Sequence, residues 1–227
     1  MLNYIKRSLV ESNKAHKSLR IHNVPVNIIA PFTNDIDPTA VFDKIQKIVP
    51  LSLVKNVDVF YVANIEDFQR ENGSFNALYK DGAIYISPEQ DSEADLIDDL
   101  IHEIAHSLEK EYQDEIYGDG NLEREFLGKR RTLHHLVDKP TLSMINYNNA
   151  EYNKQFDLHM YEDLGYDYLR TLSAGLFYSP YAITSLREYW ANGFENYLLG
   201  DRSRLKDLSP VLYNVVYNII NNSEEYS

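Results

Sequence analysis

The spacing of hydrophobic residues along the chain changes near residue 90. Before that point, apolar residues occur in short runs rich in Val, Ile, Tyr and Phe, which is the pattern of β-strands. After that point they recur every three or four residues, as on one face of an amphipathic helix. We therefore expect a small sheet with accompanying helices in residues 1–90 and a mainly helical region in residues 91–227.

Several separate elements are predicted within the first ninety residues. The charged opening segment is expected to be helical up to about Arg20, and Asp37-Pro38 is expected to start a helix that ends before Pro50. Asp81-Gly82 predicts a tight hairpin turn, because this pair readily takes positive φ angles. The expected strands are residues 21–31, residues 57–63 and two short strands within 75–87.

The second part of the chain carries clear signals for helix ends. Asp91 or Ser92 can cap a helix, and the acidic residues that follow favour the positive end of the helix dipole. Glycines at 118 and 120 interrupt the helical pattern, residues 121–137 resume it, and residues 146–153 form a polar loop. Ser179-Pro180 predicts another helix start, with a helix reaching Leu198. The expected fold class is α+β.

One predicted helix carries the segment His102-Glu103-Ile104-Ala105-His106. A helix advances about 100° per residue, so His102 and His106 lie one above the other with Glu103 beside them. Two neutral imidazoles can hold Zn²⁺, the metal acidifies a bound water, and an unligated Glu can take the proton. The alternative interpretation is a solvated helix face that happens to contain two histidines. The apolar residues of this helix fall on the opposite side, so the metal site and the core do not compete.

A catalytic zinc site needs a third protein ligand. One extension of the motif would place Gly and His at positions 109 and 112, but Glu109 and Tyr112 stand there. The later helix offers Glu188 as the third ligand, and we expect Tyr181, seven residues earlier, to donate a hydrogen bond to a developing oxyanion. Asn192 on the same face is expected to orient one of the histidines.

Other metal ligands remain open in the region between the two motifs. His134 and His135 are sequential and point about 100° apart on a helix, which makes a shared metal awkward. His159 is a further possibility. If Glu188 is not the third ligand, Glu162 is the next candidate.

Together, these motifs resemble the gluzincin metallopeptidases related to the anthrax lethal factor catalytic domain and the bacterial Pro-Pro endopeptidases. The matching pieces are the segment from His102 to His106 and the stretch from Tyr181-Ala182 to Glu188-Tyr189-Trp190-Ala191-Asn192-Gly193-Phe194-Glu195-Asn196-Tyr197. The resemblance implies peptide-bond hydrolysis with one catalytic zinc ion, and a zincin-like fold in which a small twisted sheet lies over the active-site helix.

The same resemblance carries two further expectations. It implies that the strand before the active-site helix binds the substrate backbone by strand addition; here its residues are Ala83, Ile84, Tyr85 and Ile86. The interval from His106 to Glu188 is longer than in compact members of the family. Residues 118–175 are therefore expected to form a helical insertion over the cleft.

Composition narrows the classes of function. The 227 residues are expected to form a single domain, and their formal net charge of −13, without a dense basic run, argues against a nucleic-acid partner. There is no cysteine, so any transition metal must be held by His, Asp and Glu. No membrane span or signal peptide is recognised in the sequence, so we expect a cytoplasmic protein as encoded, with export by another route or association with a virion as alternatives.

The leading hypothesis is a zinc-dependent endopeptidase with a peptide or protein substrate and Glu103 as general base. One rival is a structural or virion-associated zinc protein with little proteolysis. Another is a zinc amidase that acts on a cell-wall peptide. The presence of Glu103 and Tyr181 favours an enzyme, because a purely structural zinc site needs neither.

Overall fold

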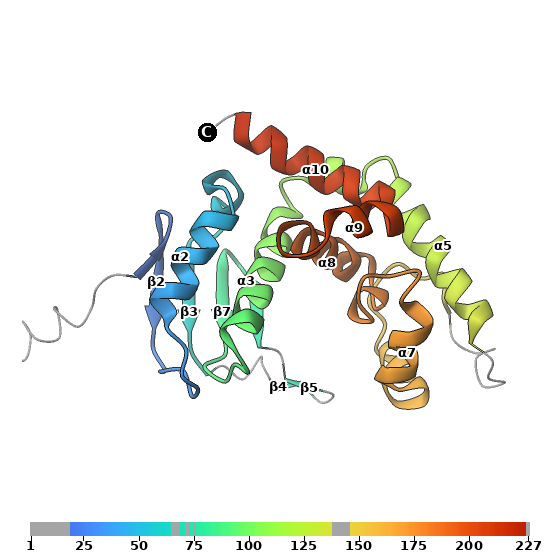
Figure 1. The fold of residues 1–227 in the computed structure, drawn as a ribbon, viewed down its shortest axis with the longest axis horizontal. Helices are drawn as coiled ribbons and strands as arrows, with labels where there is room; N and C mark the ends of the chain where they lie inside the picture. The colour runs from blue at the N-terminus through green and yellow to red at the C-terminus, as the bar shows by residue number, and fades with distance from the viewer. Residues whose placement is uncertain (1–18, 65–68, 71–72, 75, 138–145, 226–227) are drawn as a thin grey trace, which may run out of the picture.

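The computed structural model describes residues 19–64, 69–70, 73–74, 76–137 and 146–225. Over these residues the chain is mixed α+β, as its hydrophobic pattern predicts. Figure 1 shows the sheet with α2 and α3 at one end of the molecule and α5 and α7 at the other, with α8 and α9 between them. Helix α3 follows residue 90 in the sequence but packs on the sheet, and its contact with α8 joins the sheet to the helical region.

The main sheet has five strands in the order β1-β2-β3-β7-β6. Its three inner strands run parallel to one another, and the edge strands β1 and β6 are antiparallel to their neighbours. A separate two-stranded ladder is formed by β4 and β5. The strands are β1 (Leu19–Ile21), β2 (Val24–Ile28), β3 (Val59–Val62), β4 (Gln69–Arg70), β5 (Gly73–Ser74), β6 (Ala77–Lys80) and β7 (Ala83–Ile86).

The β6–β7 hairpin forms as predicted. Asp81 and Gly82 take φ angles of 51° and 81°, which matches the tight turn expected of Asp-Gly. The prediction of one long strand over residues 21–31 is wrong, because His22 has a φ of 54° and turns the chain back into an antiparallel pair. Leu19 and Arg20 belong to β1 rather than to a helix, and residues 1–18 of that predicted helix lie outside the described residues.

The position of Ala83–Ile86 corrects another expectation. These residues form β7, which pairs with β3 on one side and β6 on the other. Its backbone N–H and C=O groups are used by these two neighbours, so β7 cannot accept a further strand. The edge strand on this side of the sheet is β6.

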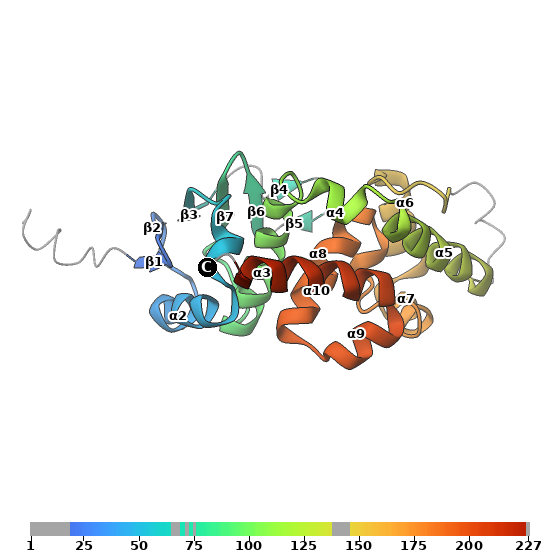
Figure 2. The ribbon, with the colours of Figure 1, turned by 90° about the horizontal axis from the view of Figure 1, so that it is seen from above.

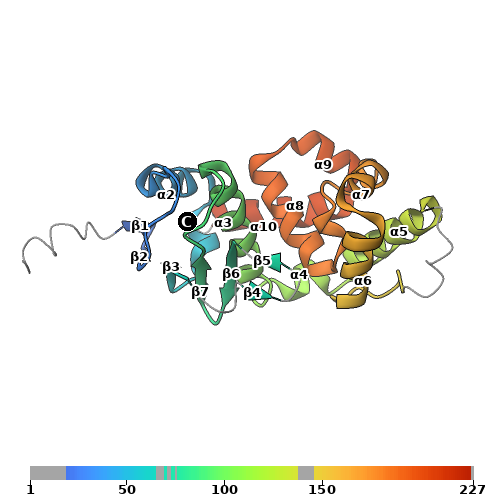
Figure 3. The same cartoon turned by 90° about the horizontal axis from the view of Figure 1, so that it is seen from below.

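Two helices, α2 (Pro38–Ile48) and α3 (Glu93–Leu108), cover the same face of the sheet (Figures 2 and 3). Asp37 caps α2 by accepting hydrogen bonds from the backbone N–H groups of residues 39 and 40. Ser92 caps α3 by accepting from the N–H of Asp95 at 3.2 Å. Each leucine or isoleucine that α3 buries contributes about 1.5–3 kcal/mol; these residues are Leu96, Ile97, Leu100, Ile101, Ile104 and Leu108.

The remainder of the described chain is helical, including residues 118–175 apart from their undescribed stretch and connecting loops. None of the helices in the described ranges is long and apolar enough to cross a membrane. The elements are η1 (Leu51–Val54), α4 (Gln113–Tyr117), α5 (Asn121–Leu136), α6 (Lys154–Leu158), the π-helical turn η4 (His159–Leu164), α7 (Tyr166–Ser173), η5 (Tyr181–Ile183), α8 (Leu186–Leu199), α9 (Arg202–Leu208) and α10 (Pro210–Glu225).

The start of α8 differs from the prediction. Ser179-Pro180 does not begin this helix; it leads into the short 3-10 turn η5, and α8 starts after Ser185. Ser185 is extended, with φ −156° and ψ 167°, and its hydroxyl accepts a hydrogen bond from the N–H of Glu188 at 3.2 Å. Ser185 and Glu188 have the Ser-x-x-Glu spacing of a helix start. Tyr181 and Glu188 therefore belong to separate elements.

Candidate metal centre

His102, His106 and Glu188 converge at the interface of α3 and α8. Each offers one ligand atom, and these three atoms all lie within 4.8 Å of one another. One carboxylate oxygen of Glu188, Oε2, lies 2.9 Å from His102 Nε2 and 3.4 Å from His106 Nε2. The group is close enough to hold a metal ion, and its members are the three residues that the sequence predicted as ligands.

The packing of α3 against α8 fixes this geometry. The indole Nε1 of Trp190 donates a 3.1 Å hydrogen bond to the backbone oxygen of Ala105, and both residues are buried. Trp190 lies two residues after Glu188, and Ala105 precedes His106. The two helices are therefore joined by a buried bond close to the ligands. Because an unpaired buried indole N–H is costly, this bond disfavours sliding of one helix along the other.

The three groups strongly perturb one another. Burial disfavours protonation of His102, but hydrogen bonds to Glu188 and Glu195 outweigh burial and raise its pKa to about 10. Burial likewise opposes protonation of His106, while Glu109 and Glu188 raise its pKa to about 9. Burial alone would raise the pKa of Glu188, but the two histidines hold it well below its usual range. The negative charge of Glu188 stabilises the two protonated imidazoles. It can equally stabilise a metal ion that takes the place of their protons.

A carboxylate lies behind each histidine, and sequence reasoning missed both. Glu109 Oε1 lies 2.5 Å from His106 Nδ1, and Glu195 Oε2 lies 3.4 Å from His102 Nδ1. Arg187 Nε donates to the other oxygen of Glu109 at 2.7 Å. A carboxylate at Nδ1 favours the tautomer that leaves Nε2 free for a metal and fixes the orientation of the ring.

The expected role of Asn192 requires correction. In the described structure its buried amide Nδ2 donates to Glu195 Oε2 at 3.5 Å rather than to a histidine. Asn192 thus supports the carboxylate that contacts His102, and Glu195 takes the role that was assigned to Asn192. The available signal was spacing, because Glu195 lies seven residues after Glu188 and therefore on the same face of α8.

Glu103 and Tyr181 lie at the rim of the cluster. Glu103 Oε2 accepts a 2.6 Å hydrogen bond from the backbone N–H of Tyr79 in β6. The rings of His102 and Tyr181 are 5.8 Å apart. Although Tyr181 is 43% exposed as a residue, shielding of its hydroxyl and the carboxylates of Glu188 and Glu103 raise its pKa well above the usual value. Tyr181 therefore keeps its proton and remains a hydrogen-bond donor.

The hydrogen bond from Tyr79 also orients the edge strand. Tyr79 is paired with Ile84 of β7, and its N–H points away from β7 towards Glu103. In an antiparallel ladder, alternate residues direct both backbone groups outwards. The outer edge of β6 therefore runs beside Glu103.

Acidic residues extend along α3 away from the cluster. Burial, with Glu103 and Glu195 nearby, raises the pKa of Asp99 to about 7 although His102 opposes this shift. Burial and the neighbouring carboxylates of Glu195 and Asp95 raise the pKa of Asp98 to about 6. Like-charged carboxylates that raise one another's pKa show a negative potential, which favours a cation at this interface.

The other histidines considered as ligands have different surroundings. His134 stacks on Tyr147 with ring centres 4.5 Å apart, and buried His159 contacts Asp163 Oδ2 through Nδ1 at 2.7 Å. Among the described residues, the grouping that could hold a metal does not include them or Glu162.

The chain was compared with known protein families, with curated proteins and with solved structures, and none of the three comparisons gives a match. No relative therefore supplies a function for the metal cluster. The residues around His102, His106 and Glu188 and their geometry are what indicate a function.

Proposed function

We propose that this chain is a zinc-dependent endopeptidase of the gluzincin type with a zincin-like fold. One observation carries the proposal: a His-His-Glu cluster from α3 and α8 has a further carboxylate, Glu103, and a protonated phenol, Tyr181, at its rim. A site that only stabilised the fold would need neither a base nor a hydrogen-bond donor beside the metal.

The donor set fits zinc. Two imidazoles and one carboxylate are three protein ligands of the type found in catalytic zinc sites, where a fourth position stays open. His102, His106 and Glu188 would hold the ion, and Glu109 and Glu195 would support the histidines. When bound, zinc acidifies water and polarises a substrate carbonyl.

Glu103 is assigned as the general base. It neighbours His102 in sequence but is not a member of the His-His-Glu group. The Tyr79 N–H holds one of its oxygens at 2.6 Å, which restricts rotation of the carboxylate. In this assignment Glu103 removes the proton of the attacking water and then delivers a proton to the leaving amine.

Tyr181 is assigned as the oxyanion donor. Its hydroxyl keeps the proton because burial and the carboxylates of Glu188 and Glu103 oppose ionisation and raise its pKa. A donor beside the ligands strengthens its hydrogen bond as the carbonyl oxygen of the substrate gains negative charge.

The edge strand β6 is assigned to the substrate in place of β7. The outward N–H of Tyr79 is taken by Glu103, and the other outward-facing backbone groups of β6 can pair with an extended peptide by strand addition. The Tyr79 N–H lies at this edge and also bonds Glu103, so a peptide on β6 lies beside the base. This arrangement favours a peptide or protein substrate.

The proposal is tested with zinc-loaded wild type, Glu103→Gln and Tyr181→Phe proteins on a peptide library, with bound zinc measured in parallel. Glu103→Gln should retain zinc and lose cleavage, because it keeps the shape of the side chain and removes the base. Tyr181→Phe should retain zinc and lose about 10²-fold or more in turnover. Glu123→Gln, at an exposed site in the first turn of α5, is the matched control.

Two results would reject this function. Undiminished cleavage by Glu103→Gln would remove the assigned base. Stoichiometric zinc in a wild-type protein that cleaves no peptide of the library would instead favour a structural zinc protein or an amidase with a different substrate.

A further inference from the structure

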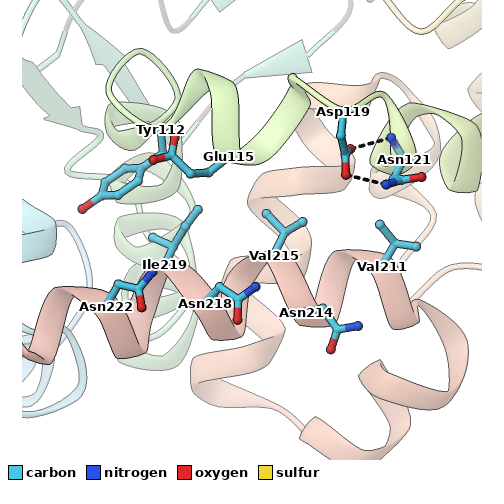
Figure 4. A pocket seen from close by; sticks show the side chains of 10 residues that line it. All are labelled: Tyr112, Glu115, Asp119, Asn121, Val211, Asn214, Val215, Asn218, Ile219 and Asn222. Carbon is cyan, nitrogen blue, oxygen red and sulfur yellow. Dashed lines mark hydrogen bonds between the residues drawn. The ribbon is translucent and has the colours of Figure 1, made fainter.

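A groove separates α4 and the start of α5 from α10 (Figure 4). It encloses about 600 Å³. Val211, Val215 and Ile219 recur every four residues along α10 and give the groove an apolar strip. The opposite wall is formed by Tyr112, Glu115 and Asp119.

Three asparagines follow the apolar strip along α10. Asn214, Asn218 and Asn222 are exposed, and within the described part of the chain their amides make no hydrogen bond. Residues four apart on a helix are separated by about 6 Å. Alternate residues of an extended peptide repeat every ~6.6–6.8 Å, which is close to this spacing. Each amide can donate to a peptide carbonyl and accept from a peptide N–H.

The charged residues that line the groove are all acidic. Glu115 and Asp119 are exposed, and no Lys, Arg or His belongs to its described lining. The cations beside the lining residues Tyr112 and Asn121 are already engaged, because Lys55 pairs with Glu111 and Arg124 donates to Asn121. The chain as a whole carries a formal net charge of −13. A cationic partner is therefore favoured both locally and at long range.

We propose that the groove between α4 and α10 binds an extended peptide segment that carries lysine or arginine side chains. The amides of α10 hold the peptide backbone, the apolar strip contacts its methylene groups, and Glu115 with Asp119 attracts its cationic ends. This binding goes beyond the proposed hydrolysis and does not require it.

The groove is distinct from the metal cluster. The short helix α4 lies between them. Burial raises the pKa of Tyr117 on this helix, and Glu109 lies close enough for its charge to raise that pKa further, whereas Glu115 on the same helix lines the groove. Substitutions at Glu115 or along α10 can therefore test the groove without touching a proposed ligand.

The test uses the full chain with Glu103→Gln, which prevents cleavage during the titration. The probe is a fluorescein-labelled peptide of alternating lysine and serine, about eight residues and roughly 27 Å long when extended. A matched peptide has glutamate in place of lysine. Fluorescence anisotropy should show tighter binding of the lysine peptide, and its affinity should fall as the salt concentration rises.

Two variants in the groove and one control variant outside it test whether the peptide binds in the groove. Asn218→Ala should weaken binding about fivefold, the loss expected of one hydrogen bond. Glu115→Lys should weaken it further, because it turns an attraction into a repulsion. Asn221→Ala should leave affinity unchanged, since Asn221 also lies on α10 but donates to the Tyr217 backbone oxygen outside the groove lining. Circular dichroism and zinc content verify that each variant is folded.

Equal binding of the lysine and glutamate peptides would overturn the proposal, and so would unchanged affinity in both groove variants. The N-terminal segment of the chain is a competing occupant, because residues 1–18 contain four Lys and Arg residues and one Glu. If the peptide binds only after these four cations are replaced by serine in the full chain, the groove holds this segment and the proposal of an external peptide is wrong. Loss of peptide cleavage in Glu103→Gln is a separate result and does not bear on the groove.

Discussion

The two helices that supply the metal ligands, α3 and α8, are built in different ways. Helix α3 has a buried apolar side against the sheet and a polar side that carries the histidines and Glu103. Helix α8 is buried on most of its circumference, with Tyr189, Trp190, Asn192, Phe194 and Asn196 all inside the protein. The position of α3 follows from its own pattern, whereas α8 depends on what surrounds it.

The residues that control the geometry of the His-His-Glu cluster differ between the two helices. On α3 the spacing of His102 and His106 alone brings the two rings together. On α8, Glu188 reaches both rings because the Trp190 bond and the contact of Gly193 with α10 hold the helix in place. Substitutions in the cap or packing of α3, away from the ligands and Glu109, should therefore act mainly through the stability of the fold, and those in α8 should also act through the geometry of the site.

Glu188→Ala should have the largest effect, because Glu188 is the α8 ligand and its carboxylate faces both imidazoles. We expect zinc affinity to fall by more than the ~10–100-fold typical of a residue that only supports a ligand. Titration of metal-free protein with zinc against a competing chelator measures the loss. Wild-type zinc affinity in this variant would show that the third ligand lies elsewhere and that α8 does not supply a ligand.

Glu109→Gln and Glu195→Gln compare the two supporting carboxylates. Each should weaken zinc binding by ~10–100-fold, because each orients a histidine through Nδ1. The larger loss is expected for Glu109→Gln, since its contact is 2.5 Å against 3.4 Å and Arg187 holds its other oxygen. The same competition titration ranks them, and a reversed order would show that the Glu195 contact is the stronger one.

Gly193→Ala tests the surroundings of α8. A Cβ at this position would overlap the side chain of buried Leu212 on α10, so we expect a loss of about 1–3 kcal/mol in the free energy of unfolding. Gly128→Ala in α5 is the matched control, because its added Cβ meets only Arg131 at 3.8 Å and should stabilise the helix by up to ~1 kcal/mol. Urea denaturation measures both, and equal effects would contradict tight packing at Gly193.

Substitutions at the two N-cap serines should have the smallest effects on stability, and they distinguish α3 from α8 most directly. Ser92→Ala and Ser185→Ala should each cost about 1 kcal/mol of unfolding free energy. Only Ser185→Ala should also lower zinc affinity, because Ser185 bonds the N–H of Glu188 itself, whereas Ser92 lies ten residues before His102. Zinc titration beside urea denaturation separates the two. An equal decrease of zinc affinity in both variants would remove the difference between α3 and α8.

Helices and turns that are specified by residues close together in the sequence could be predicted. Helix α2, the β6–β7 hairpin and α3 each carry a cap or turn signal next to a regular apolar pattern. The grouping of His102, His106 and Glu188 was also predicted, because i, i+4 geometry and the need for a third ligand restrict the choices. These inferences rest on spacing within one element or on the chemistry of one ion.

Features that depend on tertiary contacts were not predicted. The edge position of β6 is a matter of strand order, which no local pattern encodes, so the sequence alone does not show that Ala83–Ile86 lies inside the sheet. The contact of Glu195 with His102 becomes visible only when both helices are in place. Glu109 is a local i, i+3 neighbour of His106, so its spacing was available in the sequence. The break between η5 and α8 was signalled by Ser185 and Glu188, but Ser179-Pro180 offered a competing start.

The separation of the ligands along the chain has a consequence for stability. Glu188 lies 86 residues after His102, so an ion bound by both would cross-link the two halves of the fold and close a long loop in the polypeptide. A covalent cross-link around a loop of this size restricts the unfolded chain by about 4–5 kcal/mol in the simple entropic picture. The chain has no cysteine and forms no disulfide. A bound zinc ion would act as its reversible counterpart, with a contribution that follows the concentration of free metal.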